Sequence, residues 1–350
     1  MSSSCPTRPA TIADVAARAG VSPATVSRVM NGTRTVDEEM TERVRMAARE
    51  LDYSPSPLAR SLVLGRTNTV AVVVPDLGNP TFHGVLRGLS HAAARNGFHV
   101  LVADSAESVA DEMVLARQTR RRCDGLVLVA PRTAEPDLEQ LLTSLRPVVV
   151  VNRELSADTG TPVVTADYRV GLTGLLELLY ADGHRSLMFL AGAPQSASNT
   201  RRLAALDAFL VAHPDLIVEI RACGVNFADG YDAAGAIAAS GVTGVLAFND
   251  LVAMGLISAL TEAGIAIPAA MSVVGFDDIP FARYVTPPLT TAAVPVAEMG
   301  EQAWQRMWDL LSGRPPGPTL VLSPHVVRRG SAGPAPDPGE QLNRGTANGP

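Results

Sequence analysis

Residues 11–32, TIADVAARAGVSPATVSRVMNG, predict two short helices joined by a tight turn. Thr11 can cap the first helix through its hydroxyl, and Gly20 can adopt the left-handed conformation that ends it. Ser22 can then cap a second helix, with Pro23 at the first helical position, where an N–H has no partner anyway. Two helices joined by a turn that contains glycine predict a helix-turn-helix.

The second helix of such a motif lies in the major groove of DNA. Its short polar side chains suit phosphate oxygens, which set the register on the duplex: Ser22, Thr25, Ser27 and Asn31. The candidates for facing the bases are Pro23, Ala24 and Arg28, and an arginine can donate two hydrogen bonds to guanine. On composition alone, the same residues could form the solvated face of a three-helix protein-interaction module, with a third helix over about residues 37–51.

A turn-like Ser-Pro-Ser-Pro run at residues 54–57 marks a boundary. Beyond it, short apolar runs alternate with amphipathic stretches, for example the helices expected over residues 81–96 and 251–263. Continuous apolar strands suit a parallel sheet that is covered on both faces, and we expect them at residues 70–74, 99–103, 125–129, 147–151, 187–191, 244–248 and 271–275. One β/α set before about Asp167 and one after it predict two doubly wound α/β subdomains with a cleft between them.

The charge of the chain is unevenly distributed. The 350 residues carry 29 basic residues, all of them Arg, against 35 acidic ones, for a net charge of −6. Residues 1–66 hold nine Arg and seven acidic residues (+2), which leaves −8 for the remainder. A basic head on an acidic body is compatible with DNA binding by the head alone.

Several classes of protein are disfavoured by the sequence. Apolar runs stay well below the roughly 18 residues of a membrane span, and the first ten residues contain no apolar signal segment, so we expect a cytoplasmic protein. Three separated cysteines, Cys5, Cys123 and Cys223, fit reduced thiols better than a disulfide framework. Without Lys there is no phosphate-binding Gly-Lys loop. No nucleophile elbow or metal-ligand histidine spacing is present either. We therefore expect that the protein is not an enzyme and that it binds neither a cofactor nor a metal.

Residues 11–32 closely resemble the DNA-binding head of the lactose/galactose repressor (LacI/GalR) family, and the resemblance extends over about residues 10–329. A match this long favours DNA binding over the protein-interaction module. It implies a sequence-specific transcriptional repressor of carbohydrate-uptake or catabolic genes. It also implies a body like that of periplasmic binding proteins, a small sugar-like effector in the cleft, and a homodimer on a near-palindromic DNA operator.

Composition and the resemblance together give the expected domains: a disordered N-terminus (1–9), a helix-turn-helix domain (10–54), a hinge helix and linker (55–66), a ligand-binding and dimerisation domain (67–330) and a disordered, Gly/Pro/Ala-rich tail (331–350). The hinge, SPLARSL at residues 56–62, is so short that folding only on DNA is reasonable. In the family this segment inserts an apolar wedge between base steps. Leu62 matches the wedge and Arg60 belongs to the same motif. Wedge insertion needs two hinges side by side, so the geometry also implies a homodimer.

Loops at the ends of the expected strands carry carboxylate, amide and guanidinium groups, where ligands bind in open α/β sheets. By position in the family motifs, the resemblance implies three principal ligand contacts: Arg202, Asn249 and Asp277. A second group follows from the same comparison: Phe82, Arg153, Asp167 and Phe227. Any single Asp or Asn among them could equally well be a helix or turn cap.

Two positions depart from the family pattern. Asn152 stands where the family commonly has Asp, which removes a charged acceptor, and the loop 227–231 is about two residues short, which puts a stacking role for Phe227 in doubt. Trp304 and Trp308 fit a core or interface better than a sugar platform. Two alternatives to the sugar-controlled regulator stay open: a DNA-binding regulator controlled by a protein co-repressor, and a solute-binding protein, which would need a secretory signal and no helix-turn-helix.

Overall fold

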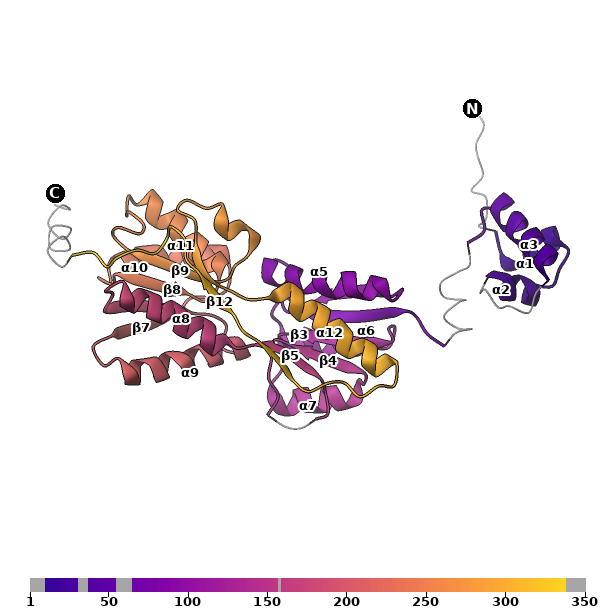
Figure 1. Cartoon of the computed structure of the whole chain (residues 1–350), viewed down its shortest axis with the longest axis horizontal. Helices are drawn as coiled ribbons and strands as arrows, with labels where there is room; N and C mark the ends of the chain where they lie inside the picture. Colours follow the sequence, from indigo (N-terminus) through magenta and orange to yellow (C-terminus); the bar gives the residue numbers. More distant parts are fainter. Residues whose placement is uncertain (1–9, 31–36, 55–64, 157–158, 338–350) are drawn as a thin grey trace, which may run out of the picture. The chain divides into compact units, whose positions relative to one another are not determined.

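The structure is a computed structural model that describes residues 10–30, 37–54, 65–156 and 159–337. It divides into two compact units, Met1–Thr67 and Asn68–Pro350 (Figure 1). Among the described residues, the first unit holds three helices and the second holds all of the strands.

The first unit contains the expected helix-turn-helix, formed by α1 (Ile12–Ala19) and α2 (Pro23–Met30) and followed by α3 (Glu38–Glu50). The Thr11 amide donates to Asp14 Oδ2 at 2.8 Å and the Asp14 amide donates to Thr11 Oγ1 at 3.4 Å, so a capping box begins α1. Gly20 ends α1 at φ 69°, in the left-handed region that favours glycine. One valine from each helix is fully buried in the small core: Val15, Val26 and Val44.

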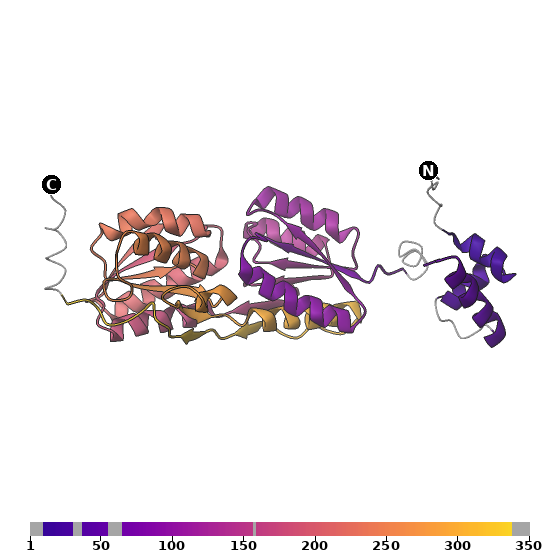
Figure 2. The same cartoon turned by 90° about the horizontal axis from the view of Figure 1, so that it is seen from above.

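The second unit contains two six-stranded sheets (Figure 2). The first has the order β11-β5-β4-β3-β1-β2, and all of its neighbours are parallel. Its strands are β1 (Thr69–Val74), β2 (His99–Asp104), β3 (Gly125–Val129), β4 (Val148–Val151), β5 (Val163–Ala166) and β11 (Leu320–Leu322). The second has the order β12-β10-β9-β8-β6-β7, parallel except for the β10–β12 pair. Its strands are β6 (Ser186–Ala191), β7 (Ile217–Ala222), β8 (Gly244–Ala247), β9 (Ser272–Asp277), β10 (Thr290–Ala293) and β12 (His325–Val327).

Helices cover both faces of each sheet, as the continuous apolar strands require. In the first subdomain, α5 (Pro80–Arg95) and α12 (Val296–Leu311) pack on one face, and α6 (Val109–Arg120) and α7 (Glu135–Ser144) on the other. In the second subdomain, α8 (Tyr168–Ala181) and α9 (Ala197–Ala212) face α10 (Phe227–Ala238) and α11 (Asp250–Glu262) across the sheet. Helices α5 and α12 lie side by side (Figure 1) and approach closely, because a Cβ on Gly300 would lie 2.1 Å from the Val85 carbonyl oxygen.

The two-subdomain α/β fold is therefore confirmed, and the seven expected strands are all present to within two residues at each end. The chain crosses between the subdomains three times, between β5 and α8, between β10 and α12, and between β11 and β12. The last crossing gives each sheet one strand from the end of the chain. Trp304 is buried beside Phe98 and donates to Asn96 Oδ1 at 2.7 Å, so it belongs to the core as expected.

The expected disordered tail is wrong for its first residues. Ser331 is fully buried, and its hydroxyl donates to the Val273 carbonyl at 2.6 Å. The Gly333 carbonyl lies 3.1 Å from His184 Nε2, and the Ala335 amide donates to the Asp182 carbonyl at 2.8 Å. Hydrogen bonds to the edge of the second subdomain hold this Gly-Pro-Ala-rich stretch in place, and composition does not reveal them. Residues 338–350 lie outside the described residues.

None of the helices in the described ranges combines the length and the apolar character that crossing a membrane requires.

Candidate functional site

The carboxyl ends of the parallel strands in the two sheets face a cleft between the subdomains, where two cavities adjoin. The inner chamber has a volume of about 30 Å³ and receives Thr81, Phe82 and Arg132 from the first subdomain and Ser198, Arg202 and Asp277 from the second. The outer chamber has a volume of about 280 Å³ and includes Arg153, Glu154 and Arg201. Asn152 and Ser198 line both chambers, so the two are neighbours.

Arg202 is the largest fully buried side chain of the described residues, with 2% of it exposed. It comes from α9, and its guanidinium carbon lies 4.0 Å from the ring centre of Phe276, 4.5 Å from that of Phe248 and 4.6 Å from that of Tyr168. Its Nη1 donates to Ser198 Oγ at 3.1 Å. Burial lowers the pKa of this guanidinium, and the nearby Asp277 opposes that shift. Three aromatic faces thus fix a buried cation at the wall of the inner chamber.

Asp277 ends β9 and carries the opposite charge. Its Oδ1 lies 4.0 Å from Arg202 Nη2, and its Oδ2 accepts from Thr81 Oγ1 at 2.7 Å. Burial raises the pKa of Asp277 to about 6, and the Arg202 charge and the Thr81 hydrogen bond oppose the rise. Because Thr81 lies on α5 of the first subdomain, this buried hydrogen bond joins the two subdomains directly.

Two buried polar atoms at the inner chamber lack a hydrogen-bond partner within the described part of the chain: Asn152 Oδ1 and Arg202 Nε. Asn152 follows β4 at φ 61°, a conformation that asparagine tolerates better than most residues. Buried polar atoms in native proteins are nearly always paired. An acceptor and a charged donor are therefore available to a ligand on opposite sides of the cleft.

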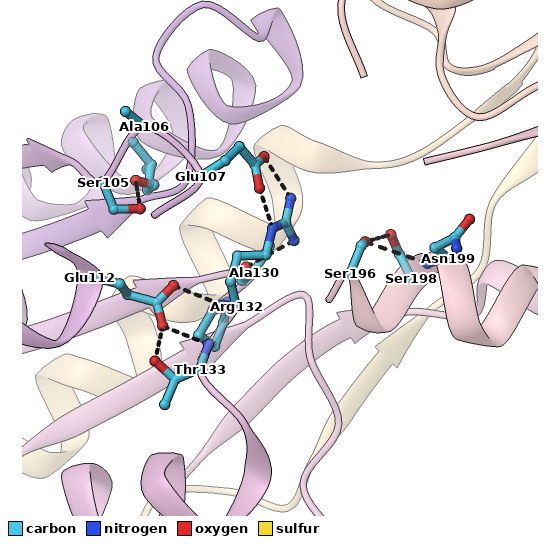
Figure 3. A network of polar contacts seen from close by, with 12 residues as sticks. Ser105, Ala106, Glu107, Glu112, Ala130, Arg132, Thr133, Ser196, Ser198 and Asn199 are labelled. Carbon is cyan, nitrogen blue, oxygen red and sulfur yellow. Dashed lines mark hydrogen bonds and ion pairs between the residues drawn. The ribbon is translucent and has the colours of Figure 1, made fainter. Parts of the chain in front are cut away.

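A second ion pair lines the inner chamber from the first subdomain. Arg132 donates from Nε and Nη2 to the two carboxylate oxygens of Glu107, at 2.6 and 2.9 Å. Beneath it, Glu112 accepts from the backbone amides of Arg132 and Thr133, at 2.7 and 3.0 Å. Figure 3 shows this network, with the first turn of α9 near Ser196 and Ser198. The network holds the Arg132 guanidinium rigidly, which favours binding without reorganisation.

The outer chamber is bridged by Glu154 from the first subdomain and Arg201 from the second, which form an ion pair. Arg153 is turned inward and donates to the carbonyls of Pro131 and Thr133, at 2.8 and 2.7 Å. Burial lowers the pKa of the Arg153 guanidinium, and Glu135 opposes the shift. Arg201 and Arg202 are adjacent in sequence, yet one is half-exposed at the mouth and the other fully buried at the wall.

The structure brings together four of the seven candidate ligand residues. Phe82, Arg202 and Asp277 line the inner chamber and Arg153 the outer one. Asn249 is buried but lines neither chamber. It caps α11 by accepting from the Val252 amide at 2.9 Å, and its Nδ2 donates to the Val225 carbonyl at 2.8 Å.

The remaining two candidates lie away from the chambers. Asp167 caps α8, accepts from the Arg169 amide at 3.1 Å and pairs with the Arg169 side chain. It lines a separate surface pocket beside Pro324 and His325. Phe227 begins α10 with 43% of it exposed and lines none of the described pockets. Both residues lie at the start of a helix, where the local turn points the side chain away from the chambers. The order of the strands, which is what the sequence predicts, does not reveal this.

Several residues at the chambers are absent from the sequence-based candidates: Thr81, Glu107, Arg132, Tyr168, Ser196 and Ser198. Tyr168 lies under Arg202 and stacks on Phe276 at 5.6 Å between ring centres. Burial, aided by Asp277, raises the pKa of its hydroxyl. Thr81 lies in the first turn of α5, directly after the polar loop that follows β1, so its place after β1 was the available signal. Arg132 and Glu107 follow β3 and β2, and only strand order brings them together.

In the first unit, Ser22 just before α2 is exposed, as are Pro23, Ala24 and Arg28 on α2. Thr25 and Ser27 are half-buried, and Ser22 Oγ accepts from the Thr25 amide at 3.1 Å and lies 2.9 Å from Thr25 Oγ1. Ser22 and Thr25 therefore support the start of α2, whereas Arg28 forms no hydrogen bond or ion pair with the side chains that the structure describes. The candidates Asn31, Arg60 and Leu62 lie outside the described residues.

Comparison with known proteins extends these observations. Residues 11–56 match the model of bacterial regulatory proteins of the lacI family, and residues 176–332 match a periplasmic binding protein-like domain. The chain is 32% identical over 332 residues to the HTH-type transcriptional regulator AscG of Escherichia coli (strain K12), covering 92% of this chain and 98% of that protein. It is 30% identical to the ribose operon repressor of the same strain, over 92% of this chain and 100% of that protein.

Among solved structures, the chain resembles the lac repressor dimer bound to its operator and the anti-inducer ONPF. The TM-score is 0.83 at 26% identity, and the match covers 93% of this chain and 99% of that one.

Proposed function

Because this chain belongs to the lacI family of bacterial regulatory proteins, we propose that it represses carbohydrate-uptake or catabolic genes and that a small, uncharged, sugar-like effector in the cleft sets its operator affinity. That the chain is a DNA-binding repressor follows from its membership of the family. The effector class and the target genes are the proposal.

The observation that carries the effector is the buried Arg202. Its guanidinium is held by three aromatic rings and lies 4.0 Å from Asp277, while its Nε has no partner within the described residues. Asn152 Oδ1 offers an unpaired acceptor across the inner chamber. A sugar hydroxyl both donates and accepts, so one hydroxyl satisfies an acceptor such as Asn152 and a neighbouring one satisfies a donor such as Arg202.

Charge balance favours an uncharged effector. The charged residues that line the two chambers are four Arg and four acids: Arg132, Arg153, Arg201 and Arg202, and Glu107, Glu135, Glu154 and Asp277. Each Arg has an acidic partner: Glu107, Glu154 and Asp277 within ion-pair distance, and Glu135 through its charge. A phosphate or carboxylate on the ligand would have to break one of these pairs, because a buried charge without a partner is costly. The ribose operon repressor and the lac repressor, both named for sugars, agree in class.

The cleft also supplies a route from effector to DNA. Thr81–Asp277 and Glu154–Arg201 join the two subdomains across the chambers. A ligand that inserts between these partners binds one arrangement of the subdomains better than the other, and it shifts the equilibrium by that difference in affinity. In a homodimer such a shift changes how two hinges and two heads meet a near-palindromic operator, and this defines the allosteric coupling.

On the DNA side, we assign base readout to Arg28 with Pro23 and Ala24, and phosphate contacts to Ser22, Thr25, Ser27 and Asn31. Arg28 is exposed on α2. Leu62, with Arg60 beside it in sequence, is proposed as the wedge that kinks the duplex between base steps. Replacing Leu62 by Ala should therefore reduce the bend angle of the operator.

Thermal shift with a panel of neutral sugars, their phosphates and nucleosides tests the effector class, since a ligand of the native state raises its apparent stability. We expect stabilisation by one or more neutral sugars, a matching change in operator affinity, and loss of both responses in Asp277→Ala with operator binding kept. Stabilisation by sugar phosphates alone would contradict the charge argument. Insensitivity of operator affinity to every small molecule would favour a protein co-repressor.

A further inference from the structure

The two edges of the first sheet differ in chemistry. All six strands are parallel, so their carboxyl ends share the edge that meets the cleft and their amino ends share the opposite edge. Four exposed arginines lie in the segments that lead into β2, β3 and β4 at the amino edge: Arg95, Arg121, Arg122 and Arg146. We call these four residues the arginine edge. Residue 69 opens β1 at the same edge, so the linker from the DNA-binding head joins the body here.

The ordinary role of arginine at this end of a helix is to bind free carbonyl groups, and Arg120 fills that role. Its Nε, Nη1 and Nη2 donate to the carbonyls of Leu145, Cys123 and Arg146, at 2.9, 2.7 and 2.8 Å. These bonds also place the end of α6 beside Arg146. Arg121 and Arg122 follow directly, are exposed, and form no ion pair with any residue that the structure describes. Structural need therefore accounts for Arg120 and not for its two neighbours.

Within the segments 95–98, 121–124 and 145–147, which carry the arginine edge, the acidic residue is Asp124. Asp124 lies in the same segment as Arg122 and accepts from the Asn68 amide at 2.8 Å, so part of its hydrogen-bonding capacity is used by the backbone. The body as a whole is acidic, with a net charge of −8 over residues 67–350. A positive edge on a negative body, at the point where a DNA-binding head is attached, complements the phosphate backbone of duplex DNA.

We propose that the arginine edge binds the phosphates of the DNA that flanks the operator, as a second DNA contact in addition to the helix-turn-helix and the hinge. It adds affinity that is independent of sequence, since phosphate contacts carry no base information. The contact depends on DNA binding by the head and not on the effector, so it stands or falls independently of the proposed sugar.

The test uses the full-length protein and an operator selected from random duplexes. Affinity is measured for a duplex trimmed to the operator and for the same operator within a duplex several helical turns longer, across a salt series. Arg121→Gln/Arg122→Gln removes two charges from the arginine edge. Arg221→Gln/Arg283→Gln, in the second subdomain, removes the same charge elsewhere and serves as the matched control. Both variants keep long polar side chains at exposed or half-exposed positions.

We expect the wild type and the control to bind the longer duplex more tightly than the trimmed one. For the Arg121/Arg122 variant, the affinity for the longer duplex should depend less on salt. For each lost phosphate contact, the slope of log affinity against log salt concentration should be smaller by roughly 0.9, which is about threefold in affinity over the usual salt range. On the trimmed duplex all three proteins should bind alike. Arg121→Glu/Arg122→Glu should turn the gain into a loss.

Equal gains from flanking DNA in the wild type and the Arg121/Arg122 variant would overturn the proposal. So would an equal loss on the trimmed and the longer duplex, because these arginines would then support the fold or the head.

Discussion

The helix-turn-helix head and the effector cleft are built from contacts of very different range. The capping box of α1 joins Thr11 and Asp14, three residues apart. The hydrogen bond that closes the inner chamber joins Thr81 and Asp277, 196 residues apart. Local sequence therefore determines the head, whereas strand order determines the cleft. A change in the head should act on one contact with a small, local cost, and a change in the cleft should act on stability and response together.

The largest expected effect is that of Arg202→Met. The substitution keeps much of the volume but leaves Asp277 buried without its cation, and breaking a buried pair in this way costs about 3–5 kcal/mol. We expect that loss in the free energy of unfolding of the body, measured by denaturant titration, together with loss of the effector response.

Arg201→Met is the matched control, one residue earlier in the chain. Its ion pair with Glu154 is 43% and 37% exposed at the two side chains, and exposed pairs contribute at most about 1 kcal/mol. A similar loss in the free energy of unfolding for the two variants would show that the difference in burial between Arg201 and Arg202 does not determine how much each stabilises the body.

A second effect of the cleft is a dependence of stability on pH. Burial raises the pKa of Asp277 from 3.8 to about 6, so the folded state holds this proton more tightly than the unfolded state. The contribution of Asp277 is therefore fully present below about pH 4 and is lost as the pH rises through 6, by on the order of 3 kcal/mol. The free energy of unfolding of the wild type minus that of Asp277→Asn should fall across this window, without effector present.

Glu135→Gln gives the opposite sign and serves as the control for the pH series. Hydrogen bonds from Ser156 hold the pKa of Glu135 below its ordinary value of 4.5. Its contribution is present above that value and is lost as the pH falls. A flat difference curve for Asp277→Asn between pH 4 and 6 would contradict a carboxyl group whose pKa is raised by burial.

In the head, Arg28→Ala should reduce the preference for operator over random DNA by about 1–3 kcal/mol, the worth of one bidentate contact to a base. Competition binding at fixed salt measures this preference. Arg18→Ala, which removes an exposed charge that pairs with Glu50, should leave the preference unchanged. An equal loss of affinity for operator and random DNA in Arg28→Ala would point to a phosphate contact.

The smallest effect is expected for Thr11→Ala, which removes the cap of α1 at a cost of about 1 kcal/mol. Because the head and the body are two compact units of the chain, we expect the loss in the unfolding of the head, followed by amide exchange in α1, and not in that of the body. Thr41→Ala, which removes a hydroxyl that donates to the Asp37 carbonyl at the start of α3, should have a weaker effect. Destabilisation of both units by Thr11→Ala would show that they are coupled.

The fold is largely predictable from sequence where burial is complete. Strands such as β3 and β4 are buried along their whole length, and their unbroken Val and Leu runs are easily recognised. Five strands are not among the expected ones. β5 and β10 are buried along their whole length, but each has only four residues, which include Thr and Ala. The edge strand β7 exposes Ile217 and Ile220 and includes Glu219, and β11 and β12 have only three residues each. Their pairing is imposed by the sheets they join.

The site is less predictable, because its residues come from separate loops. Arg202 and Asp277 follow from motif positions, and both line the inner chamber. Asn249 also matches a motif position, but its side-chain oxygen accepts from the Val252 amide and so caps α11. Arg132 gives no local signal, since its partner Glu107 belongs to a different loop. Asn152, marked by sequence as the loss of a charged acceptor, still presents an unpaired oxygen at the inner chamber.

The strands β11 and β12 also have a consequence for biosynthesis. Each completes one sheet, and both lie after residue 319, so the first sheet lacks a strand until residue 322 has been translated and the second until residue 327. At 5–20 residues per second, translation from residue 68 to residue 327 takes roughly 13–52 s. The head, complete by residue 54, is released long before then. During that interval each nascent chain carries a complete DNA-binding head on a body whose two sheets are still incomplete and which cannot yet respond to an effector.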